Sequence, residues 1–102
     1  MRSREELHEK LCDVLGTRNC YFAPPDSVKM KYPCFVYNYQ PFDNKKANDK
    51  TYILTSHYDL TYISKDPDSG IIPTLLTSFE MIRHTTTFMA DNLNHDRFDL
   101  YY

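Results

Sequence analysis

Several residue types that mark specialised sites are scarce in this sequence. The only glycines are Gly16 and Gly70, which excludes a glycine-rich phosphate-binding loop, because such a loop needs several glycines close together. The three cysteines, Cys12, Cys20 and Cys34, lack the closely spaced pairs that a zinc site uses. We therefore expect reduced, buried thiols, no bound metal and no cofactor.

Long apolar runs and an excess of one charge are also missing. No run approaches the length of about 20 residues that a membrane span requires, and the charged N-terminus has no signal-peptide hydrophobic region. These absences predict a cytosolic protein that makes no membrane contact. The net charge of -2 comes from interspersed signs. A dedicated nucleic-acid-binding protein is not expected, since it would present a basic face.

The residues that are abundant indicate one small domain rich in tyrosine. A chain of 102 residues supports a single domain over residues 1–102. It contains nine Tyr and six Phe but no Trp. High strand propensity explains most of these residues. The polar tip of tyrosine also suits half-buried sheet faces and subunit contacts.

Two segments have helical spacing. A capping box that begins at Ser3 predicts a helix over 4–15, and Gly16 supplies the left-handed residue that ends it. A second helix is predicted over 70–82, where apolar residues recur at the spacing of one helix face. Each apolar stripe must dock on another element, because an isolated helix of this length is marginal in water.

The middle of the chain has strand composition. Residues 20–22 form a short extended piece, and residues 34–40 form a strand between two prolines. Residues 42–50 have the turn chemistry of a hairpin tip. The segment 51–64 alternates apolar and polar side chains at period two, which predicts one face on a core and one polar face without a cover.

The last fifteen residues predict a hairpin that ends the domain. Two strand-like segments flank a polar cluster from Asn92 to Arg97, which we assign to the turn. Free chain ends fray, so this much apolar and aromatic content indicates a terminus tied into the fold, with nothing appended. The polar cluster then lies at one rim of the sheet.

These elements predict an α+β fold with a single mostly antiparallel sheet and two helices packed on one face. The even positions of 51–64 should be buried beneath both helices. The predicted core contains Leu7, Leu11, Leu54, Tyr58, Leu60, Leu76 and Phe79.

Two groups of polar residues are candidate sites. His57 and Asp59 have the residue types for general acid–base chemistry and share the polar face with Thr61. Solvated polar residues two apart on a sheet face are common, and we favour that interpretation of the pair. The second group, Asn92, Asn94 and His95, is either an interaction loop or a turn stabilised by local hydrogen bonds. Neither group specifies a catalytic residue, so no enzyme activity is expected.

The order of the motifs resembles that of a known family. The sequence reads PCFVY at 33–37, then a lysine- and asparagine-rich hairpin, KDPDS at 65–69, a helix and FMADNLNHD at 88–96. This order resembles the small tail terminator, or tail-completion, proteins of long-tailed phages and prophages. The similarity covers roughly residues 32–102, and no single motif has the specificity of a metal signature.

The resemblance implies a structural protein without a catalytic site or cofactor. It implies a hexameric ring that caps the tail tube, contacts the tube protein and the head connector protein, and lets DNA through only as passing cargo. It also implies a place in the virion, and in the host cytoplasm during assembly. A ring needs two different contact patches. We expect one at His57, Asp59 and Thr61, and the other at Asn92, Asn94 and His95.

Three alternatives stay open. The first alternative is a stopper or adaptor elsewhere in the same connector. The second is a bacterial interaction module of α+β type. The third alternative is a small hydrolase or nuclease-like enzyme that uses His57, Asp59 or His95.

Overall fold

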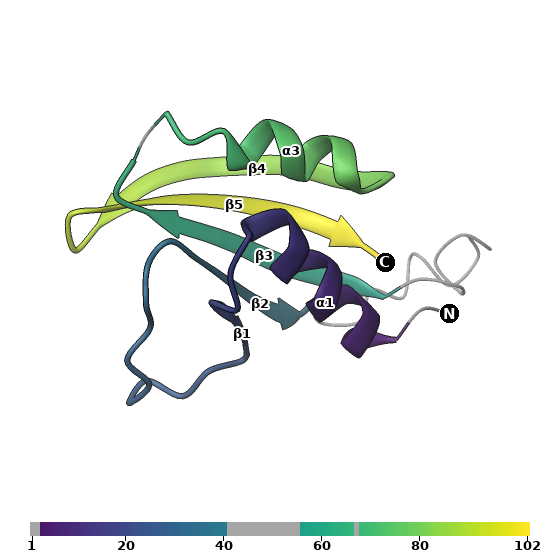
Figure 1. Cartoon of the computed structure of the whole chain (residues 1–102), viewed down its shortest axis with the longest axis horizontal. Coiled ribbons are helices and arrows are strands. Elements are labelled where there is room, and N and C mark those ends of the chain that lie inside the picture. The colour runs from purple at the N-terminus through teal and green to yellow at the C-terminus, as the bar shows by residue number, and fades with distance from the viewer. Residues whose placement is uncertain (1–2, 41–55, 67) are drawn as a thin grey trace.

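A computed structural model of the chain describes residues 3–40, 56–66 and 68–102. Within these ranges, five strands form one sheet in the order β1-β2-β3-β5-β4. Only β1 and β2 run parallel, and every other neighbouring pair is antiparallel. The elements in chain order are α1 Arg4–Leu15, β1 Cys20–Phe22, β2 Cys34–Tyr39, β3 His57–Ser64, α3 Ile71–Ser78, β4 Met81–Ala90 and β5 Leu93–Tyr101 (Figure 1).

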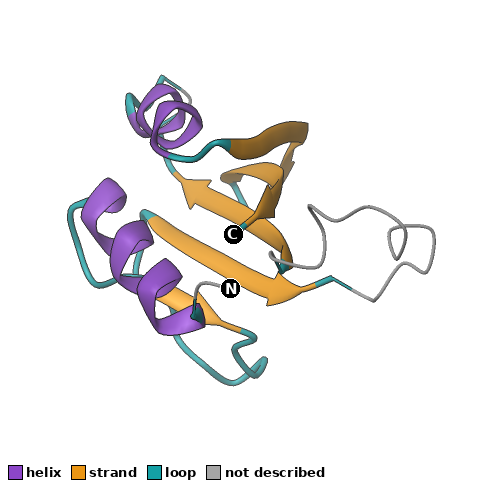
Figure 2. Cartoon of the chain, turned by 90° about the vertical axis from the view of Figure 1, so that its right-hand side faces the viewer, coloured by secondary structure: helices purple, strands orange, loops and turns teal. Residues whose placement is uncertain are grey.

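Both helices lie on the same side of the sheet, as Figures 1 and 2 show. The main core fills the space between them and the sheet. The predicted α+β class, with a mostly antiparallel sheet and two helices on one face, is confirmed. The fully buried side chains of this core come from α1, β2, β3, α3 and β5: Leu7, Leu11, Phe35, Tyr37, Leu60, Leu75, Phe98 and Leu100.

Helix α1 begins and ends where its caps predict. The Ser3 hydroxyl accepts a hydrogen bond from the Glu6 backbone N–H at 3.1 Å. Gly16 adopts the left-handed conformation, with φ 83, and its N–H donates to the Cys12 carbonyl at 2.8 Å. A residue with a Cβ would be strained at that φ, so glycine ends the helix here without a steric penalty.

Strand β3 has the predicted alternation. The side chains of Tyr58, Leu60 and Tyr62 are at most 2% exposed, whereas those at odd positions 57, 59 and 61 are half-buried. Ile63 departs from the pattern, because it is buried on the other face in a small second cluster. Leu54 and the predicted hairpin tip at 42–50 lie outside the described residues.

The predicted second helix is wrong at its C-terminal end. Helix α3 ends at Ser78, and the next residue, Phe79, is extended with φ -124 and ψ 143. Residues 81–90 form β4 instead, because hydrogen bonding to β5 along the whole segment outweighs a helical apolar spacing. The shorter helix turns Leu75 into the core, and the predicted core residue Leu76 is 37% exposed.

The C-terminal hairpin is confirmed, but its turn is shorter than predicted. Asp91 and Asn92 make a two-residue turn with φ 52 and 63. Positive φ at both positions is the conformation that matches the twist of a tight hairpin. Residues 94–97 therefore lie inside β5, paired with β3 and β4, rather than in a loop.

Candidate functional site

The candidate site is the sheet face opposite the helices, which we call the open face. The register sets His57 of β3 beside Tyr101 of β5, Asp59 beside Asp99, and residue 61 beside residue 97. Because paired residues of an antiparallel ladder point to the same side, these side chains share one surface. Arg83 of β4 joins them, since it pairs with Asp99 from the other side.

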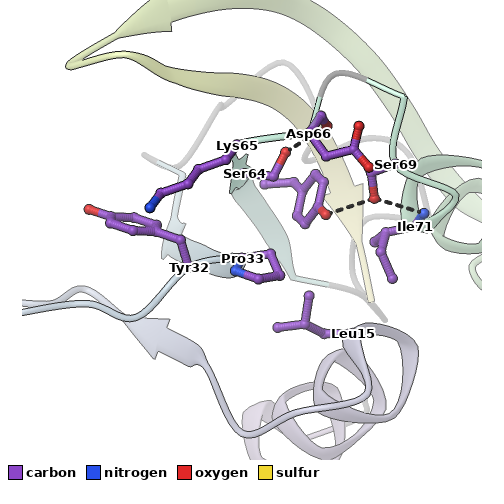
Figure 3. Close-up of a pocket in the computed structure, with 9 residues that line it drawn as sticks. Leu15, Tyr32, Pro33, Ser64, Lys65, Asp66, Ser69 and Ile71 are labelled. Carbon is purple, nitrogen blue, oxygen red and sulfur yellow. Dashed lines mark hydrogen bonds between the residues drawn. The ribbon is translucent and has the colours of Figure 1, made fainter.

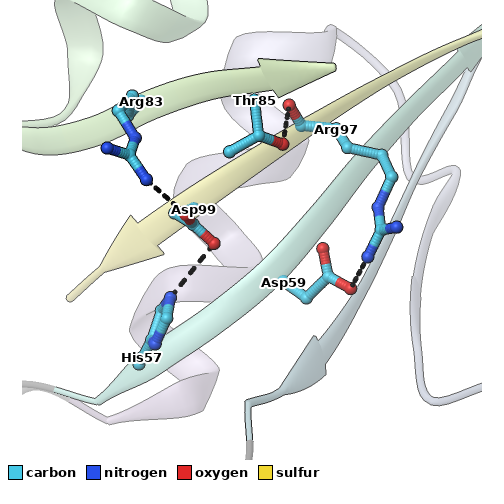
Figure 4. Close-up of polar contacts among 6 residues, drawn as sticks. All are labelled: His57, Asp59, Arg83, Thr85, Arg97 and Asp99. Carbon is cyan, nitrogen blue, oxygen red and sulfur yellow. Dashed lines mark hydrogen bonds and ion pairs between the residues drawn. The ribbon is translucent and has the colours of Figure 1, made fainter. Parts of the chain in front are cut away.

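Five of these side chains form two neighbouring hydrogen-bonded groups, a pair and a group of three, which together we call the charged network (Figure 4). An Arg97 guanidinium N–H donates to Asp59 Oδ2 at 2.6 Å. An Arg83 guanidinium N–H donates to Asp99 Oδ2 at 3.2 Å, and His57 Nε2 lies 3.2 Å from Asp99 Oδ1. The network therefore joins β3, β4 and β5 across the open face.

The two carboxylates of the network would repel one another if they were alone. Asp59 and Asp99 stand directly opposite in the β3–β5 register, where like charges are destabilising. Each has its own arginine, so the network pairs two negative with two positive charges. The open face thus presents paired charges, which suit specific polar contacts with a partner better than attraction of a highly charged ligand.

Aromatic rings flank the network at both ends. The His57 ring stacks on Tyr101, with ring centroids 4.2 Å apart and planes 14° apart. Toward the hairpin turn, Phe88 stacks on His95 at 4.8 Å and remains 41% exposed. These stacks hold the two imidazoles against the sheet and leave apolar ring area at the rim of the polar surface.

The open face is covered at one end, whereas the alternation predicts a face without any cover. Cys34, Ile63 and Leu93 form the second apolar cluster at this end. The connection between β1 and β2 reaches over it. The Met30 side chain of this connection packs on the cluster, and the Lys31 N–H donates to the Tyr21 hydroxyl at 3.0 Å. Only the part that carries the charged network stays open among the described residues.

The structure brings together four of the six predicted contact residues. His57, Asp59, Thr61 and His95 share the open face, because all lie at odd positions of β3 and β5. Asn94 pairs with Ser64 and belongs to the opposite face. The sixth, at position 92, lies in the hairpin turn. The first predicted patch therefore lies wholly on the open face, whereas only His95 of the second patch does.

Sequence reasoning missed Arg83, Arg97 and Asp99. The missed signal was alternation in β5, where polar residues at 95, 97 and 99 are separated by residues of the covered face. Assigning 92–97 to a loop hid that period. In the described part of the chain, His57 and Asp59 are not hydrogen-bonded to one another. His57 contacts Asp99, and Asp59 contacts Arg97.

All three thiols are buried, as expected, and free. Burial raises the pKa of Cys34 to about 12. Burial also raises the pKa of Cys20, and a hydrogen bond with the neighbouring Cys12 thiol contributes. His8 Nδ1 lies 2.8 Å from the Tyr37 hydroxyl. Within residues 3–40, 56–66 and 68–102, no group of three or more His, Cys, Asp or Glu side chains is arranged to hold a metal ion.

A cavity of about 280 Å³ lies on the other side of the sheet, between the end of α1 and the start of α3 (Figure 3). The Tyr62 hydroxyl lies 2.8 Å from Ser69 Oγ, which accepts from the Ile71 N–H at 3.2 Å. Ser64 Oγ donates to the Asp66 carbonyl at 3.0 Å. These hydroxyls already bind one another or the backbone, so they order the segment that begins α3.

Comparison of the chain with protein-family models, curated proteins and solved structures gave no match. Neither of the described helices is long and apolar enough to cross a membrane. The function therefore has to be argued from the motifs and from the open face.

Proposed function

We propose that this protein is a structural subunit of a long-tailed phage or prophage. In this role it forms a ring, most simply a hexamer, that caps the tail tube and joins it to the head. The observation that carries the proposal is the order of the motifs over residues 32–102, which resembles that of tail terminator proteins. The subunit acts by binding other proteins, and DNA only passes through the ring.

The position of the motifs in the fold supports the resemblance. The PCFVY motif begins before β2 and continues along it, KDPDS connects β3 to α3, and FMADNLNHD spans the β4–β5 hairpin. Strands β2, β3, β5 and β4 are consecutive in the sheet. The motifs thus belong to one contiguous structural unit, as expected of segments that act together.

The open face is the surface we assign to subunit or partner contact. Its charged network and flanking rings resemble the composition of a polar interface, in which arginine and aromatic residues are enriched. A ring requires a heterologous contact, in which this surface meets a different one on the next subunit. Asp59, Thr61 and His95 are among the predicted contact residues that this surface holds together.

The alternatives differ in the partner and in the chemistry. A stopper or adaptor would use the same open face against other connector proteins. A hydrolase would need His57, Asp59 or His95 to act on a substrate. The ion pair of Asp59 with Arg97 favours a binding role, because it engages the carboxylate that a hydrolase would use. The contact of His57 with Asp99 does not discriminate, since a carboxylate also orients a catalytic histidine.

The assignment is tested by deleting the coding sequence from the phage or prophage and examining the particles by electron microscopy. We expect filled heads and separate tails, with tails of irregular length where the tube is not capped. Normal joined virions in the deletion strain would overturn the proposal. Joining defects with capped tails of normal length would instead favour the stopper or adaptor.

A matched pair of variants tests the role of the open face. Thr61→Glu adds a charge at the centre of this face, whereas Thr74→Glu adds the same charge on the exposed side of α3. We expect Thr61→Glu to abolish complementation of the deletion strain and Thr74→Glu to retain it. Both variants should keep the native circular dichroism spectrum. Full complementation by Thr61→Glu would remove the open face from the proposal.

A further inference from the structure

Strand β4 has a strand partner on one side only among the described strands. It is the last strand in the sheet order and pairs with β5. Figure 1 shows it as the long outer arrow of the sheet. Most of its ten residues are exposed, and Phe88 and Met89 are 41% and 64% exposed. An edge of this length is a template for pairing with another chain.

Strand β4 has few of the features that usually prevent an edge strand from pairing with another chain. Its sequence, MIRHTTTFMA, has no proline, no lysine and no acidic residue. Its one arginine, Arg83, is engaged with Asp99 of its own chain, and His84 contacts Asp96 of its own chain. The one protective device is a register shift between His84 and Thr86. The opposite edge, β1, has only three residues.

The hydrogen-bonding direction along β4 follows from the ladder. Ser56 and Tyr102 exchange both backbone hydrogen bonds, at 3.1 and 3.0 Å. Such exchanges recur at every second residue, so the even residues of β5 bond to β3 and the odd ones to β4. The β4 residues opposite the even positions of β5 therefore point their N–H and C=O groups away from the sheet. These residues are Ile82, His84, Thr87 and Met89.

This set is symmetric about the midpoint of the strand. Ile82 and Met89 lie equally far from the Thr85–Thr86 centre, and so do His84 and Thr87. An antiparallel copy of the same strand therefore presents its free backbone groups at matching positions. The register shift falls at the centre, where it affects both copies equally.

We propose that β4 pairs antiparallel with β4 of a second copy of this chain, with Ile82 opposite Met89 and His84 opposite Thr87. The pair forms one continuous sheet across a two-fold axis, with all helices on the same face. A second copy fits better than the opposite edge of another subunit, because a strand of three residues cannot cover one of ten.

The side chains of this register are compatible. Arg83 of one copy faces Phe88 of the other, a cation–aromatic pair, and the two Arg83 side chains do not oppose one another. Ile82 and Met89 bury apolar area against each other, and the threonines meet at the centre. No position places like charges in register.

The proposed pairing is expected to be weak and two-fold symmetric. We expect a reversible dimer, because the contact is made through a single strand of ten residues. The contact is isologous, which distinguishes it from the heterologous contact of a ring. It does not depend on the proposed function, and it covers the edge of the free subunit against aggregation.

Sedimentation velocity on the full chain, from micromolar to millimolar concentration, tests the proposal. We expect a monomer–dimer equilibrium that Met89→Lys weakens about tenfold or more, because a lysine at the edge opposes pairing. Val28→Lys is the matched control. It replaces another exposed apolar residue, in the connection between β1 and β2, and should leave the equilibrium unchanged.

Amide hydrogen exchange of the unmodified chain identifies the contact. The N–H groups of Thr87 and Met89 should gain protection as concentration rises, whereas inward N–H groups such as that of Phe88 are protected throughout. A chain that stays monomeric at millimolar concentration would overturn the proposal. So would a dimer that Met89→Lys leaves intact, or one that gains protection at Cys20–Phe22 rather than along β4.

Discussion

The two faces of the sheet are built from the same strands but use opposite chemistry. On the covered face, Leu60 and Phe98 are fully buried between the sheet and both helices. On the open face, Asp59 and Arg97 sit one residue away from them and form an ion pair that solvent still reaches. Burial of apolar area dominates folding free energy, whereas a solvent-accessible ion pair contributes little. Stability is therefore concentrated on the covered face.

Truncation on the covered face should have the largest effect. Leu60→Ala removes a fully buried side chain and should lower the free energy of unfolding by about 2–5 kcal/mol. Thr61→Ala, the next residue on the open face, should change it by about 0.5 kcal/mol or less. Urea denaturation followed by circular dichroism measures both. Equal losses would mean that the two faces do not differ as described.

The buried thiols predict loss of stability at alkaline pH. Burial raises the pKa of Cys34 from 9.0 to about 12. The unfolded chain loses this proton near pH 9 and the folded chain does not, so the stabilisation is complete below about 9 and is lost as pH rises toward 12. Denaturation at about pH 8 and about pH 10.5 should show the decrease, and Cys34→Ala should reduce it. A thiol reagent should modify native Cys34 slowly at the lower pH.

Two nearby asparagines lie in different backbone environments, Asn92 in the hairpin turn and Asn94 in β5. Asn92 has φ 63, a conformation that a β-branched residue adopts only with strain, so Asn92→Val should destabilise the protein by about 1–2 kcal/mol. Asn94→Val places the same residue inside β5, where valine is favoured, and should cost about 0.5 kcal/mol or less. The reverse order, measured by thermal unfolding, would contradict the two-residue turn.

The ion pair of the open face should contribute least. A double-mutant cycle with Asp59→Asn and Arg97→Gln should give a coupling free energy of about 1 kcal/mol or less, since both side chains are partly exposed. The coupling should fall as salt is added. A coupling of several kcal/mol would show that the open face stabilises the fold as the covered face does.

Some of the site could be predicted because its signal is periodic. Alternation along the segment that forms β3 is enough to assign His57, Asp59 and Thr61 to one polar face, and the structure places them there. Their actual partners could not be predicted. Arg97 meets Asp59 across 38 positions of sequence, and no local pattern records which distant strand lies alongside.

The local rules of the chain determined α1, the alternation of β3 and the existence of the C-terminal hairpin. Capping at Ser3, the left-handed Gly16 and period-two patterning act over a few residues, so the sequence alone expresses them. Tertiary structure decided the rest. It made residues 81–90 a strand because β5 offered hydrogen-bond partners, and it inserted β5 between β3 and β4. Those choices depend on which segments can pair and bury area together, which is a property of the whole chain.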